Sequence, residues 1–162
     1  MSDGLDIGSV RLRAASVAVA LMLGLAGCVT APAPIPVVAG TGPGPDLIEP
    51  TEAGALFARA CIGTRPRFDG IAQALDPGAF QQATGTGTYF HQRFNLSLNA
   101  TPARCSMVFA TDRPDAEVVP ALARGTTSVV PPGEIPRDIS VSSNVDSDGL
   151  RYFRMALPGG GA

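Results

Sequence analysis

The sequence predicts an α+β fold in which a small antiparallel sheet carries two or three helices on one face. Apolar residues recur at helical spacing between residues 51 and 75, which is typical of amphipathic helices. Apolar and polar residues alternate between residues 89 and 109 and again toward the end of the chain, which is typical of half-buried strands. Helices that precede and interrupt antiparallel strands in this way indicate the α+β class.

The first predicted helix spans residues 51–62. Thr51 can cap its beginning, and Gly63 suits its end. Four apolar side chains share one face of this helix: Leu56, Phe57, Ala60 and Cys61. A second short helix is predicted to begin at Thr64 and to end before Asp76, with Pro66 in its first turn.

Residues 89–99 alternate with a period of two and predict a strand or a tight hairpin. The residues expected on the apolar face are Phe90, Phe94, Leu96 and Leu98. After a turn at residues 101–104, the next strand is expected to place Cys105, Met107 and Phe109 on the core side.

The last third of the chain predicts one more helix and a hairpin. The helix begins near Thr111 or Asp112, and Pro120 is expected to weaken it. Residues 139–143 and 150–157 form the hairpin, joined through Asp146-Ser147-Asp148-Gly149.

These elements predict one domain over residues 51–157, because that length is ordinary for a single core and no repeat divides it. Residues 28–50 are rich in proline and glycine and predict an extended linker, reaching roughly 70 Å in the polyproline form or about 25 Å as a flexible coil. Residues 158–162 are expected to form a flexible tail.

The N-terminal residues 1–27 have the order of an export signal. Arg11 and Arg13 precede an apolar stretch, residues 14–26, that is too short to span a bilayer as a helix. An uncleaved anchor and an ordinary cleaved signal remain alternatives. Acidic residues ahead of the arginines suggest that translation starts nearer Val10.

The tetrapeptide Leu25-Ala26-Gly27-Cys28 resembles the lipobox of bacterial lipoproteins. This resemblance implies that Cys28 is the lipid-attachment site and the first residue of the mature protein, held to the membrane by its acyl chains. Val29 stands where an aspartate is associated with inner-membrane retention. The resemblance therefore implies the outer membrane, on its periplasmic face.

With Cys28 lipidated, Cys61 and Cys105 can form only one disulfide. An exported protein meets an oxidising compartment, so we expect that bond. Both cysteines are also expected to face the core, one from the first helix and one from a strand. Two reduced core cysteines are the alternative.

Composition and motifs argue against several functions. The 12 basic residues, all arginine, nearly balance 14 acidic ones and form no stripe, so we expect no nucleic-acid partner. His91 is the only histidine, so no metal site is predicted, and no motif indicates a cofactor. The segment 144–149 is similar to half of a calcium loop, but a hairpin turn explains it more simply.

Two hypotheses of function follow. In the first, the domain is a non-enzymatic interaction module for a periplasmic protein, an envelope polymer or a small ligand. Its candidate binding face combines an aromatic side chain with an arginine, both common in binding sites: Tyr89, His91, Arg93 and Asn95. An ordinary solvated sheet face is the simpler alternative.

In the second hypothesis, the domain is a small envelope hydrolase that uses Ser106 or another serine near His91. Such a site requires a serine within hydrogen-bonding reach of the imidazole. The sequence contains neither G-x-S-x-G nor S-x-x-K.

Short motifs of the domain resemble those of small exported proteins of proteobacteria. They are C-x2-T-x-P-x-F from Cys61, G-T-Y from Gly87, N-L-S from Asn95 and C-S-M-V-F from Cys105. The resemblance implies a fold and a compartment, and it transfers no functional residue.

Overall fold

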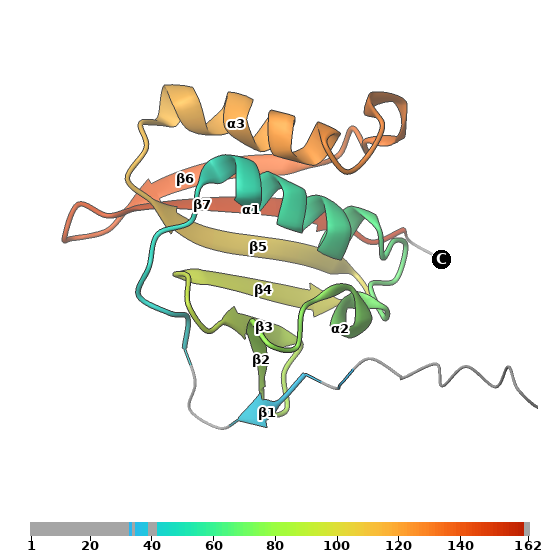
Figure 1. Cartoon of the computed structure of the whole chain (residues 1–162). Helices are drawn as coiled ribbons and strands as arrows, with labels where there is room; N and C mark the ends of the chain where they lie inside the picture. Colours follow the sequence, from blue (N-terminus) through green and yellow to red (C-terminus); the bar gives the residue numbers. More distant parts are fainter. Residues whose placement is uncertain (1–32, 34, 39–41, 161–162) are drawn as a thin grey trace, which may run out of the picture. The chain divides into compact units, whose positions relative to one another are not determined.

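The computed structural model describes residues 33, 35–38 and 42–160, and the fold is given for these residues. Seven strands form one sheet in the order β1-β2-β3-β4-β5-β7-β6 (Figure 1). Six strands pair antiparallel, and the two-residue β1 runs parallel to β2. The strands are β1 (Val37–Val38), β2 (Phe80–Ala83), β3 (Thr88–His91), β4 (Leu96–Thr101), β5 (Arg104–Thr111), β6 (Ser140–Val145) and β7 (Arg151–Pro158).

Helices lie on one face of this sheet, which confirms the predicted α+β class (Figure 1). They are α1 (Pro50–Phe57), which continues into the π-helical turn η1 (Ala58–Ile62), α2 (Ile71–Ala74), α3 (Asp115–Thr127) and the short 3₁₀ turn η2 (Pro132–Glu134). The expected first helix and the C-terminal hairpin are therefore both present.

The second helix is shorter than predicted. Thr64 does not cap it, because the Thr64 hydroxyl bonds to the Ala60 carbonyl of the preceding turn. Phe68 adopts a positive φ of 61°, which no helix interior accommodates. The helix α2 consequently begins only after Gly70.

The core lies between the helices and the sheet. Phe57 of α1, Phe109 of β5 and Phe153 of β7 are almost fully buried there. The rings of Phe109 and Phe153 stack with their centroids 5.8 Å apart. These side chains identify the core face of β5 and β7, because residues in register on neighbouring strands share a face.

The two long helices approach each other through glycines. A Cβ atom at Gly125 of α3 would lie 1.9 Å from the Thr51 carbonyl oxygen, and one at Gly54 of α1 would lie 2.3 Å from the Leu122 carbonyl oxygen. The Thr126 hydroxyl, buried at the same contact, donates a 2.9 Å hydrogen bond to the Leu122 carbonyl. Backbone thus packs against backbone at this crossing.

α3 runs through Pro120 for 13 residues, so the predicted weakening does not interrupt it. Pro120 cannot donate to the carbonyl of Ala116, one turn earlier. Both residues are exposed, so water can satisfy that carbonyl.

The predicted linker is partly folded onto the domain, which corrects the expected boundary at residue 51. Ile35 and Ile48 are 7% and 2% exposed. β1 pairs with β2, and Asp46 bridges to Phe94. Ile35 and Ile48 therefore bury against the core, and the folded unit begins near Ile35.

The predicted flexible tail is also held in part. The Gly159 N–H donates to the Ala103 carbonyl at 2.8 Å, and the Gly160 N–H donates to the Pro66 carbonyl at 3.2 Å. Backbone approaches backbone closely here, since a Cβ at Gly159 would lie 2.3 Å from the Pro102 carbonyl oxygen. Residues 161–162 lie outside the described residues.

Candidate functional site

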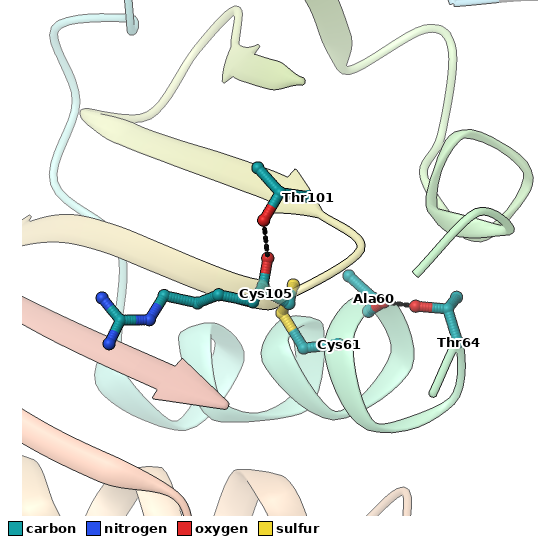
Figure 2. The surroundings of a disulfide bond; sticks show 6 residues. Ala60, Cys61, Thr64, Thr101 and Cys105 are labelled. Atoms are coloured by element: carbon teal, nitrogen blue, oxygen red, sulfur yellow. Dashed lines mark hydrogen bonds between the residues drawn. A yellow bond between two sulfur atoms is a disulfide. The ribbon is translucent and has the colours of Figure 1, made fainter. Parts of the chain in front are cut away.

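The predicted disulfide joins Cys61 of η1 to Cys105 of β5 (Figure 2). The two Cα atoms are 5.6 Å apart, and both side chains are fully buried. The bond therefore fastens the end of the first helix to the beginning of β5, as the two sequence patterns indicate.

The four residues of the candidate binding face do not share one face. Tyr89 pairs with Leu98 and is 6% exposed on the core side, whereas Phe90 pairs with Ser97 and faces away from the helices. The expected grouping of Phe90 with Leu96 and Leu98 is therefore wrong. Residues 92–95 leave the ladder between β3 and β4, and this break shifts the phase of the alternation.

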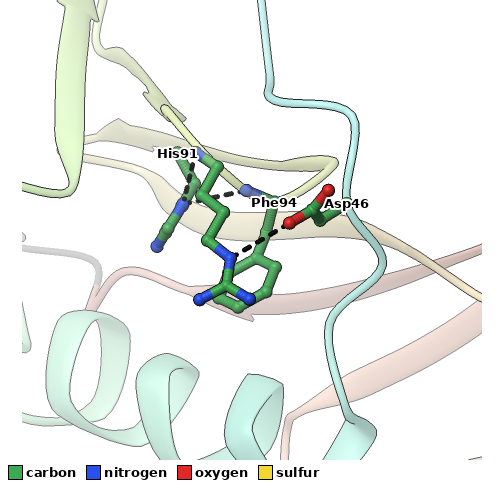
Figure 3. Close-up of polar contacts among 4 residues, drawn as sticks. Asp46, His91 and Phe94 are labelled. Atoms are coloured by element: carbon green, nitrogen blue, oxygen red, sulfur yellow. Dashed lines mark hydrogen bonds and ion pairs between the residues drawn. The ribbon is translucent and has the colours of Figure 1, made fainter.

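The His91 side chain bonds to the backbone of the segment that leaves the ladder (Figure 3). Its Nδ1 atom accepts hydrogen bonds from the backbone N–H groups of Arg93, at 3.1 Å, and Phe94, at 3.0 Å. Its ring lies 4.8 Å from the Phe80 ring centroid and 4.7 Å from that of Phe94. The imidazole thus acts as a turn cap between two aromatic rings.

Burial is the main cause that lowers the pKa of His91 below its ordinary value. The Arg93 charge lowers this pKa as well, while Glu52 and Asp76 raise it. Because Nδ1 accepts two backbone hydrogen bonds, the neutral ring carries its proton on Nε2. Nδ1 is consequently not free to take a proton from a nucleophile.

Arg93 and Asn95 point to different surroundings. The Arg93 Nε donates to Asp46 Oδ2 at 3.0 Å, and its guanidinium carbon lies 5.0 Å from the Phe94 ring centroid (Figure 3). The Asn95 amide lies 3.4 Å from the Tyr152 hydroxyl, on the side of the sheet away from the helices. The predicted face is therefore divided between the core, one edge loop and the opposite side of the sheet.

A hollow of about 270 Å³ borders His91 on the helix side of the sheet. Its charged lining residues are Glu52, Arg59 and Asp76. No serine is among its described lining residues. Ser106 lies on the other side of the sheet, paired with Asn99 and 5% exposed.

The side of the sheet away from the helices, here called the outer face, is the larger feature. Its central row runs across five strands through Phe90, Ser97, Val108, Arg154 and Ser142. Of the described residues, no helix covers these positions, which are half-buried or exposed. Among the side chains whose burial the structure describes, those buried on this face are all small: Ser106, Ala110 and Ala156.

The charge of the outer face has one sign. None of its strand residues is a carboxylate, whereas it carries Arg104 and Arg154. Neither arginine forms an ion pair with any described residue. The alternation in β5 and β7 is a signal in the sequence that could have located both arginines. Buried Met107 and Met155 mark the core face, and the period of two places Arg104 and Arg154 on the other face of the sheet.

Comparison of the chain with protein-family models, curated proteins and solved structures gives no match. Within the described residues, no helix is long and apolar enough to cross a membrane. The predicted signal segment, residues 1–27, and the lipid-attachment residue Cys28 lie outside the described residues.

Proposed function

We propose that this chain is a lipoprotein of the bacterial cell envelope, anchored through Cys28 and facing the periplasm from the outer membrane. The lipobox-like tetrapeptide ending at Cys28 and the disulfide between Cys61 and Cys105 support this proposal, because disulfides persist in oxidising compartments. Buried Ile35 lies seven positions after Cys28, and seven residue steps span at most about 25 Å when extended. When fully extended, the tether therefore reaches about a third of the roughly 70 Å expected for residues 28–50 in the polyproline form.

The folded part is proposed to be a non-enzymatic binding module whose binding surface is the outer face of the sheet. One observation carries this proposal: none of the described strand residues on the outer face is a carboxylate, and its two arginines form no ion pair with any described residue. The whole chain has a net negative charge, so the positive charge of the outer face is a local feature. Charge complementarity favours an anionic partner.

The geometry of the outer face suits a polymer better than a small ligand. Arg104 pairs with Pro158, which lies four residues from Arg154 along β7. A rise of about 3.3 Å per residue and a strand spacing of about 4.8 Å place the two Cα atoms about 14 Å apart. Both arginines can bind carboxylates or phosphates bidentately at that spacing. We therefore propose an anionic envelope polymer as the partner.

Side chains near the arginines supply further contacts. Tyr152 and Phe90 offer half-buried aromatic rings, and Asn95, Ser97 and Asn99 offer amide and hydroxyl groups. Such groups can pack against and hydrogen-bond the sugar rings of a polysaccharide. The proposed partner is thus a polysaccharide that carries acidic groups.

Binding can be tested with polygalacturonate, a carboxylated polysaccharide, and neutral dextran as probes for the full-length chain in detergent. We expect polygalacturonate alone to bind, and the Arg104→Gln/Arg154→Gln double variant to lose at least tenfold in affinity. Arg124→Gln/Arg137→Gln is the matched control, because it removes the same charge from exposed arginines outside the outer face. Equal loss in both variants, or equal binding of dextran, would contradict the proposal.

The anchor is tested separately with Cys28→Ser. We expect this variant to lose incorporation of labelled palmitate and to leave the membrane fraction. A variant that keeps the label and the membrane location would remove the lipoprotein assignment without touching the assignment of the outer face.

The alternative, a hydrolase with a serine beside His91, has no supporting observation among the described residues. Ser106 and His91 lie on opposite sides of the sheet, and the Nδ1 atom of His91 already accepts two backbone N–H groups.

A further inference from the structure

The two edges of the sheet differ in how they end. One edge is closed by β1, a strand of only two residues that directly follows Pro36. Short strands and prolines prevent further pairing at an edge. The other edge is β6, six residues long, and every residue in it is exposed.

Within the described part of the chain, the β6 edge lacks the usual protection against pairing. Its sequence, SVSSNV, contains no charged residue, proline or glycine. Long uncharged edge strands pair readily with other strands, and proteins ordinarily interrupt them with charges, prolines or bulges. Two of the exposed large apolar residues of the described chain, Val141 and Val145, lie in this strand, 39% and 50% exposed.

The direction of the free backbone groups follows from the ladder. The Asp146 N–H donates to the Leu150 carbonyl, in register with the β6–β7 pairing. Backbone groups alternate in direction along a strand, so even-numbered residues of β6 bond to β7. The N–H and C=O groups of Val141, Ser143 and Val145 therefore point out of the sheet.

We propose that the β6 edge pairs antiparallel with β6 of a second copy of this chain, about a two-fold axis at Ser143. In this register Ser143 lies opposite the partner's Ser143, and Val141 lies opposite the partner's Val145. Every outward N–H and C=O group then gains a partner, giving six backbone hydrogen bonds across the axis.

Side chains favour a second copy over an unrelated strand. In an isologous contact each residue meets its counterpart twice, once on either side of the two-fold axis. Val141 and Val145 lie two residues on either side of Ser143, so valine meets valine in both places. They project on the helix side, where Val141 pairs with Met155 and Val145 pairs with Arg151. Cross-strand pairs of β-branched residues stabilise sheets, and no like charges oppose each other within β6.

Sedimentation of the full-length chain in detergent, corrected for bound detergent, tests the proposal. We expect a dimer, and we expect Val141→Lys/Val145→Lys to halve the protein mass because the lysines would face each other across the axis. The matched control is Val119→Lys/Val129→Lys, which changes two valines of similar exposure, 51% and 38%, that are not part of β6. A monomeric wild-type chain at 50 µM, or a dimeric edge variant, would overturn the inference.

Cross-linking tests the register without requiring the edge to be disrupted. Ser143→Cys should form a disulfide-linked dimer on mild oxidation, because Cα atoms of opposed residues lie about 5.5 Å apart. Ser142→Cys should not, since Ser142 would lie opposite Asn144 of the partner subunit. Self-linking by Ser142→Cys alone would show that the axis is not at Ser143.

Discussion

Gly125→Ala tests the close contact between α1 and α3. Alanine is a better helix former than glycine and by itself would stabilise an exposed helix by about 1 kcal/mol. At this position the added Cβ would lie 1.9 Å from the Thr51 carbonyl oxygen. Contacts under 3.0 Å are essentially never seen, so the two helices must separate by at least 1.1 Å, the difference between the two distances.

That separation disturbs the core beneath the helices. Phe57 is almost fully buried one turn after Gly54, and Leu122 packs in the same cluster from α3. Overpacking a close contact costs about 1–3 kcal/mol, and a clash with backbone that must open by 1.1 Å belongs to the upper part of that range, about 2–3 kcal/mol, against a gain of about 1 kcal/mol in helix propensity. We expect a net loss of about 1–2 kcal/mol in the free energy of unfolding.

Urea unfolding followed by far-UV circular dichroism measures this loss. Gly133→Ala is the matched control, because a Cβ there would meet nothing within 4 Å. Its stability should change by less than about 0.5 kcal/mol. If Gly125→Ala proved as stable as the wild-type chain, the helices would not be held at backbone contact and the reasoning would fail.

Three further predictions concern single interactions. Replacing Cys61 and Cys105 by alanine should lower the free energy of unfolding by about 4 kcal/mol, because the bond closes a loop with a sequence separation of 44 residues; urea unfolding measures this. The lowered pKa of His91 means that the unfolded chain binds more protons as pH falls from 7 toward 5, so stability should fall in that range. His91→Asn should reduce this slope in melts at each pH, because its amide oxygen can still accept the backbone N–H groups without titrating. Asp46→Asn should cost less than about 1 kcal/mol in urea unfolding, because the ion pair with Arg93 is exposed, at 51% and 72%.

The sequence was sufficient to predict elements with a strong local signal. The first helix, the disulfide and the hairpin around Asp146 each follow from spacing or turn chemistry. Gly149 has a φ of 82° and the Asp146 carboxylate accepts the N–H groups of Asp148 and Leu150, as a turn of this composition predicts.

The faces of the candidate site residues could not be predicted, because a break in the ladder between β3 and β4 changes which residues face the core. A period of two assigns residues to the faces of a sheet only while the strand is continuous. A shift by one residue moves every following side chain to the other face. His91 stabilises the irregular segment between β3 and β4 by accepting hydrogen bonds from the backbone N–H groups of Arg93 and Phe94. The sequence pattern gives no sign of these hydrogen bonds. Tyr89 therefore enters the core, while Phe90 joins the outer face.

Composition does not predict the boundary of the domain, for a different reason. Proline and glycine between residues 32 and 50 exclude a regular helix, yet they leave room for single apolar side chains to dock. Ile35 and Ile48 do so, and β1 adds two residues to the sheet edge. Composition indicates the average tendency of such a segment to remain unfolded, whereas the burial of Ile35 and Ile48 decides where this one lies.

The two proposals reinforce each other geometrically. A two-fold axis perpendicular to the sheet keeps both outer faces on the same side, so pairing at the β6 edge would extend the outer face without a gap. Arg154 lies opposite Ser142, and in the proposed register Ser142 lies opposite the partner's Asn144. Three strand spacings and a two-residue offset then place the two Arg154 Cα atoms about 16 Å apart, close to the 14 Å within one copy. A dimer would therefore present four arginines at nearly even intervals, and a long anionic polymer could bind both copies at once with the gain in apparent affinity that multivalency supplies.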